Sequence, residues 1–64
     1  MSYREARELA SLRQWLRDRL SAQDPDGATL ALRRLREVAG ADIELRAEYE
    51  RWSFRFDCLA AAAG

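Results

Sequence analysis

The sequence predicts an all-α fold, a small antiparallel bundle of three helices within a single domain, residues 1–64. Three observations support this. Apolar residues recur every three or four positions along most of the chain, which is the period of an amphipathic helix. Only one short stretch alternates apolar and polar residues as a strand would. Turn and cap residues cluster at two places, around Pro25 and Gly40, and divide the chain into three parts.

The first helix is expected over residues 3–22. Its apolar residues lie on one face of a helix of about five turns. They are Ala6, Leu9, Leu12, Leu16 and Leu20. Arg13 lies within the same arc, and Trp15 lies on its shoulder rather than at its centre. We expect this face to pack against the rest of the chain.

A loop at residues 23–25 separates the first helix from a second one at about 25–39. Asp24 is a natural N-cap residue, and Pro25 fits the first position of a helix because its missing N–H has no partner there. The apolar face of this helix comprises Ala28, Ala31, Leu32, Leu35, Val38 and Ala39. Leu30 falls outside that face and is expected to be exposed.

Gly40 and Asp42 predict a break between the second and third helices. Glycine is common just after a helix, and aspartate is a good N-cap for the next one. A two-helix hairpin is the alternative, because a heptad-like spacing of apolar residues continues through Gly40 and an internal glycine costs only about 1 kcal/mol. The paired cap signals favour the break.

The third helix is expected at about 42–62, although "ERWSFRFDCL" (50–59) alternates like a strand. Its flanks are strong helix formers without a turn residue, and a single strand would have no pairing partner. This helix carries two opposite apolar stripes. The larger is Leu45, Tyr49, Trp52, Phe56 and Leu59, and the smaller is Ile43, Ala47, Phe54, Cys58 and Ala61.

We assign the larger stripe to the core because buried aromatic side chains contribute the most contact area. The expected core is Leu9, Leu12, Leu16, Leu20, Leu35, Val38, Leu45, Tyr49, Trp52 and Phe56. The smaller stripe needs a second copy of the chain or another protein. The alternative is that the first two helices sandwich the third and cover both stripes.

The composition argues against enzymatic activity, cofactors and metal sites. There is no histidine to act as a base near neutral pH, and no glycine-rich phosphate loop. Cys58 is the sole cysteine, so an internal disulfide is impossible, and no zinc-ligand spacing occurs. Beside Phe54 and Leu59, Cys58 is expected to be a small buried apolar group. The sequence therefore predicts a non-enzyme without a small-molecule substrate.

The predicted function is that of a small assembly or adaptor module, which packs its helices against copies of itself or a larger protein. A chain of this length cannot bury much surface alone, and oligomerisation is one common remedy. The residues expected to bind the partner are Trp15, Leu30, Phe54 and Cys58.

The alternative function is a small helical regulator that binds DNA or RNA. The candidate contacts are Arg13, Arg17, Arg33, Arg34 and Arg36, since arginine suits phosphate and base contacts. Two features weigh against it: the net charge is zero, and the third helix begins with an acidic stretch. Helical spacing also predicts that acids neutralise some arginines, as in Arg33 with Glu37 and Arg46 with Glu50.

Two stretches, "ASLRQWLRDRL" (10–20) and "ADIELRAEYERW" (41–52), resemble the small head–tail joining (adaptor) proteins of tailed phages. Those chains carry a Trp-Leu pair in the first helix, here Trp15-Leu16. Their last helix begins with an Ala-Asp-Leu/Ile sequence, here Ala41-Asp42-Ile43, and has a tryptophan about three turns on, here Trp52. The resemblance covers about a third of the chain and implies a multicopy virion component. The family's short β-hairpin is missing, because residues 28–39 read as helix.

The sequence also bears on location. No apolar run approaches the ~20 residues that a membrane span needs, and the N-terminus has no apolar signal region. A lone thiol fits a reducing compartment. We therefore expect a cytoplasmic protein without membrane contact, or a virion protein if the phage resemblance holds.

Overall fold

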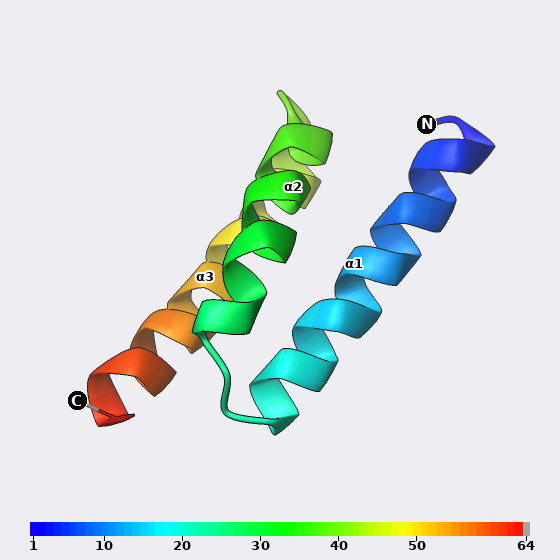
Figure 1. The fold of residues 1–64 in the computed structure, drawn as a ribbon. Coiled ribbons are helices and arrows are strands. Elements are labelled where there is room, and N and C mark those ends of the chain that lie inside the picture. The colour runs from blue at the N-terminus through cyan, green and yellow to red at the C-terminus, as the bar shows by residue number, and fades with distance from the viewer. Residues whose placement is uncertain (64) are drawn as a thin grey trace.

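The computed structural model describes residues 1–63, which form three α-helices. α1 spans Tyr3–Ser21, α2 spans Thr29–Ala39 and α3 spans Ile43–Ala63. Consecutive helices run in opposite directions, so α1 and α3 point the same way (Figure 1). α2 packs extensively against both α1 and α3, which contact each other much less. The described residues contain no strand, and the predicted all-α, three-helix fold is confirmed.

α1 begins at a cap that its own sequence provides. The Ser2 hydroxyl accepts a hydrogen bond from the backbone N–H of Glu5 at 3.2 Å, which satisfies one of the free donors of the first turn. Glu5 also places a negative charge near the positive end of the helix dipole. After Ser21 the chain reverses through Gln23, whose φ of 54° lies in the left-handed region.

Asp24 organises the connection between α1 and α2. Its carboxylate accepts hydrogen bonds from the Gly27 backbone N–H at 3.0 Å and from Arg19 at 3.1 Å. These bonds lower the pKa of Asp24, with the larger effect from Gly27. A Cβ at position 27 would collide with the Asp24 carboxylate, so a larger residue there would displace this side chain from its hydrogen bonds.

α2 begins later than Pro25, where the sequence places its start. The chain first forms a short 3₁₀ turn, η1, at Asp26–Ala28. The reason is local: the Ala28 N–H bonds to the Pro25 carbonyl three residues back, at 3.2 Å, which is the 3₁₀ pattern. The α-helical pattern is established only from Thr29.

The helix break at Gly40 is present, and the two-helix alternative is wrong. Gly40 has φ 52° and ψ −120°, a conformation that ends α2. The Asp42 carboxylate then accepts a hydrogen bond from the Leu45 backbone N–H at 3.1 Å, as an N-cap does. The cap signals thus override the continuous heptad-like spacing.

The core lies where the three apolar faces meet, and the larger stripe of α3 faces it as predicted. Buried members of the expected core are Leu9, Leu12, Leu16, Leu35, Leu45 and Phe56, and partly buried ones are Leu20, Val38, Tyr49 and Trp52. Three alanines, Ala28, Ala31 and Ala39, are also buried. Their small side chains let η1 and α2 pack closely against the neighbouring helices.

Across residues 1–63, none of the helices combines the length and apolar character required to cross a bilayer.

Candidate functional site

The smaller apolar stripe of α3 is exposed along its length. The exposed α3 face consists of Ile43, Ala47, Phe54, Cys58 and Ala61. Ile43 and Phe54 are 84% and 70% exposed, which is unusual for side chains of this size. Cys58 is also exposed, so the expectation that it is a small buried group is wrong for the single chain.

The exposure of this face follows from the way the helices pack. Phe56 and Leu45 point to the core shared with α1 and α2, and Phe54 lies roughly opposite on the helix. Both other helices therefore cover the same side of α3. The alternative in which they sandwich α3 from two sides is wrong.

Charged residues border the exposed α3 face on both sides. At 100° per residue, Glu44, Arg51 and Arg55 lie on one flank, and Arg46, Glu50 and Asp57 lie on the other. All six are exposed. An apolar centre with a charged border is the usual composition of a protein–protein contact.

Trp15 and Leu30 do not belong to this face. The Trp15 indole N–H donates to the Gly27 carbonyl at 3.1 Å, so this partly exposed side chain also holds the α1–α2 connection in place. Leu30 is exposed in the first turn of α2. The structure thus groups Phe54 with Cys58 on one surface and leaves the other two expected contacts elsewhere.

Arg13 and Glu48 form a paired contact between α1 and α3. Arg13 donates twice to the carboxylate, at 2.8 and 2.7 Å, and the Trp52 indole N–H donates to it at 3.3 Å. The Glu48 side chain is only 15% exposed, against 39% for Arg13. The Arg13 hydrogen bonds are the main reason that the pKa of Glu48 lies below its ordinary value.

A groove between α1 and α3 begins at this ion pair. Its lining is Arg13, Arg17, Glu48, Arg51, Trp52 and Arg55, around a cavity of about 240 Å³. Glu48 is the sole acid of the lining and is engaged by Arg13. The Arg55 guanidinium lies 5.4 Å from the centre of the Trp52 ring. The groove therefore presents a net positive charge beside an aromatic ring.

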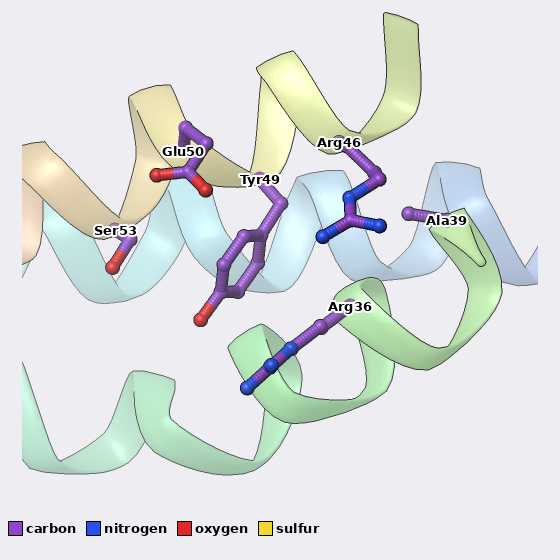
Figure 2. A pocket seen from close by; sticks show the side chains of 6 residues that line it. All are labelled: Arg36, Ala39, Arg46, Tyr49, Glu50 and Ser53. Atoms are coloured by element: carbon purple, nitrogen blue, oxygen red, sulfur yellow. The ribbon is translucent and has the colours of Figure 1, made fainter. Parts of the chain in front are cut away.

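A second hollow lies between α2 and α3 (Figure 2). Arg36, Ala39, Arg46, Tyr49, Glu50 and Ser53 line a volume of about 260 Å³. Figure 2 shows the Tyr49 ring reaching from α3 towards α2, next to the Arg36 side chain. No ion pair joins Arg46 to Glu50 among the described residues, so the expected helical pair is wrong. Arg33 lines the adjoining surface with Arg36.

Arg34 differs from most of the other candidate nucleic-acid contacts because its guanidinium is paired with two acidic side chains. It donates twice to Glu8 of α1, at 2.6 and 2.9 Å, and once to Glu37 at 3.0 Å. The hydrogen bonds from Arg34 lower the pKa of Glu8. Glu37 therefore pairs with Arg34 rather than with Arg33, and the positive charge of this part of α2 is reduced.

Two inter-helix pairs, Arg13–Glu48 and Arg34–Glu8, are absent from the sequence-based expectations. A partial signal existed for the first, because Arg13 falls inside the apolar arc of its helix and needs a partner there. Nothing in the sequence identified Glu48 as that partner.

Comparisons with protein-family models, with curated proteins and with solved structures find no match for this chain.

Proposed function

We propose that this protein is a non-enzymatic assembly or adaptor module that binds a protein partner through the exposed α3 face. The observation that carries the proposal is the exposure of Ile43 and Phe54 on a helix whose other side is already buried. Ile43 and Phe54 lie about 16 Å apart along one side of α3, with the exposed Ala47 between them, and an exposed apolar strip on a small domain is typical of an interaction surface. Covering them would also add apolar burial to a chain with a small core.

Phe54→Glu tests this proposal. A charge at the centre of the face should weaken association at least about thirtyfold, as for a hot-spot residue, and leave the fold unchanged. Sedimentation velocity and far-ultraviolet circular dichroism measure the two effects. Ser11→Glu adds the same charge at an exposed position on α1 and serves as the matched control. Equal behaviour of both variants and the native chain would refute the proposal.

A head–tail joining role in a tailed-phage virion is our more specific proposal for this module. Its support is the resemblance at Trp15-Leu16, Ala41-Asp42-Ile43 and Trp52. The departure is also clear, because η1 and α2 stand where that family has a short β-hairpin. Capsid, portal and tail genes next to the coding gene are the expected finding. A neighbourhood without phage genes would remove this proposal and leave the module itself.

Nucleic-acid binding is a second candidate, and the α1–α3 groove favours it. Arg17, Arg51 and Arg55 meet there without a paired acid among residues 1–63, and a groove of unpaired arginines suits contacts with phosphates. Fluorescence anisotropy with labelled single-stranded DNA should then show binding that weakens as salt rises. Arg17→Glu should abolish that binding, whereas Arg4→Glu, at the other end of α1, should not. An absence of binding at low salt would exclude this candidate.

A further inference from the structure

We infer that the occupant of the exposed α3 face is the same face of a second copy, with the two α3 helices parallel about a two-fold axis. The inference rests on the proposed function and specifies the partner. Such an interface is self-complementary, because each surface meets an identical one.

The apolar residues fit a parallel pairing. Each residue then lies at the height of its own counterpart, so Phe54 meets Phe54 and Cys58 meets Cys58. Two phenylalanine rings that meet across the interface can form a favourable offset-stacked or edge-to-face pair. The small side chains of Ala47 and Ala61 allow the two helix backbones to approach closely on either side of the rings.

The charges on the flanks select the same orientation. In a parallel two-fold pair, one flank of each helix faces the opposite flank of its partner. From N- to C-terminus, the first flank reads negative, positive, positive, and the second reads positive, negative, negative. The facing pairs are Glu44 with Arg46, Arg51 with Glu50, and Arg55 with Asp57. Members of a pair differ in height by one or two residues, about 1.5–3 Å, within reach of their side chains.

An antiparallel pairing places like charges together at its centre, although Glu44 with Arg55, and Arg46 with Asp57, still form attractive pairs. In that arrangement each flank of one helix faces the same flank of the other helix, which runs in the opposite direction. When Phe54 packs over Ala47 of the other copy, the axis falls at the level of Glu50 and Arg51. Arg51 then meets Arg51 on one flank, and Glu50 meets Glu50 on the other. Since flanking charges set the orientation of paired helices, the parallel arrangement is favoured.

For all three charge pairs of the parallel arrangement to form, one side chain must leave its position in the single chain. Arg55 lies over the Trp52 ring in the single chain, and its guanidinium must turn towards Asp57 of the second copy. The central pair, Arg51 with Glu50, can form without the loss of a contact to an aromatic ring.

Cysteine cross-linking in the Ile43→Cys variant, which keeps Cys58, tests the orientation. The two thiols of one chain are fifteen residues apart on a helix, about 22 Å, so they cannot join each other. Diamide is the oxidant and takes up two protons and two electrons per disulfide. A parallel pair should join position 43 to 43 and position 58 to 58, whereas an antiparallel pair should join 43 to 58. Mass spectrometry of the proteolysed dimer identifies the linkages.

Two controls separate failure of this inference from failure of the proposed function. Phe54→Glu combined with Ile43→Cys should lose the cross-links, because the face no longer pairs. Ser11→Cys with Cys58→Ser places a single exposed thiol on α1 and should not cross-link. Linkage of 43 to 58, or dimers without like-to-like linkage, would overturn the orientation while Phe54-dependent association stands. A native chain that stays monomeric at all concentrations would overturn the self-pairing. The proposed function would then be judged by whether Phe54→Glu, but not Ser11→Glu, abolishes binding to a larger protein partner.

Discussion

Two phenylalanines two residues apart on α3 contribute very differently to the stability of the folded chain. Phe56 is 3% exposed and packs in the core, whereas Phe54 is 70% exposed. Their rings lie on opposite sides of the same helix, so the same substitution at each position compares a buried ring with an exposed one. We expect Phe56→Ala to destabilise the single chain severely and Phe54→Ala to leave its stability almost unchanged.

The expected magnitudes follow from burial. Truncating a fully buried phenylalanine costs about 3–5 kcal/mol, and a domain of this length has roughly 3–10 kcal/mol of total stability. Phe56→Ala therefore removes a large share of the stability or all of it. Burial of a whole phenylalanine side chain contributes about 1.5–3 kcal/mol, so the covered part of Phe54 contributes roughly 0.5–1 kcal/mol. The better helix propensity of alanine offsets about half a kcal/mol of that.

Urea unfolding followed by circular dichroism measures both effects at low micromolar protein, and a second series at higher concentration adds the association. The native midpoint should rise with concentration, because pairing stabilises only the folded chain, and that rise should disappear in Phe54→Ala. If Phe54→Ala lowered the free energy of unfolding as much as Phe56→Ala at the lowest concentration, Phe54 would be a core residue and our interpretation of α3 would be wrong.

Three further predictions concern the contacts that hold the helices together. The pKa of Glu48 lies below its ordinary value of 4.5, so the ionised carboxylate stabilises the fold above that pH, and the contribution is lost as the pH falls through the lower folded-state pKa. The difference in unfolding free energy between native and Glu48→Gln should therefore be constant near neutral pH and shrink in acid; a pH-independent difference would contradict this. Gly40→Ala should cost about 2 kcal/mol through its backbone conformation alone, since an added Cβ meets no atom within 4 Å, and D-alanine at this position should be tolerated in thermal unfolding. Trp15→Phe removes the hydrogen bond to the Gly27 carbonyl and should cost about 1 kcal/mol in chemical unfolding; no loss would show that water replaces the bond.

The elements that were predictable from the sequence are those that depend on local rules. Gly40 and Asp42 are neighbours with clear preferences at helix ends, so the break between α2 and α3 could be inferred without knowing any tertiary contact. The burial of Phe56 and Leu45 also followed from local information, because the larger aromatic stripe of a helix gains most by facing the core.

The missed features depend on how separate helices rotate and slide against each other. Arg13 and Glu48 are 35 residues apart, and Arg34 and Glu8 are 26 apart. Which acid meets which arginine depends on the relative rotation of two helices, which no single-helix pattern contains. The η1 turn was missed for a different reason: Asp24 and Pro25 are compatible with the start of an α-helix or of a 3₁₀ turn, and the choice becomes visible only in the bond from the Ala28 N–H to the Pro25 carbonyl.

The exposed α3 face remains unexplained by the energetics of the single chain. The described residues occupy a flat shape of 39 × 20 × 14 Å, in which α1 and α2 both cover the same side of α3. Within residues 1–63 no other element covers Ile43 and Phe54. Glutamate or lysine at these positions would favour the helix at least as well and would keep the monomer more soluble. The apolar character of this face would therefore add to stability only if a partner covered it, as the proposed assembly requires.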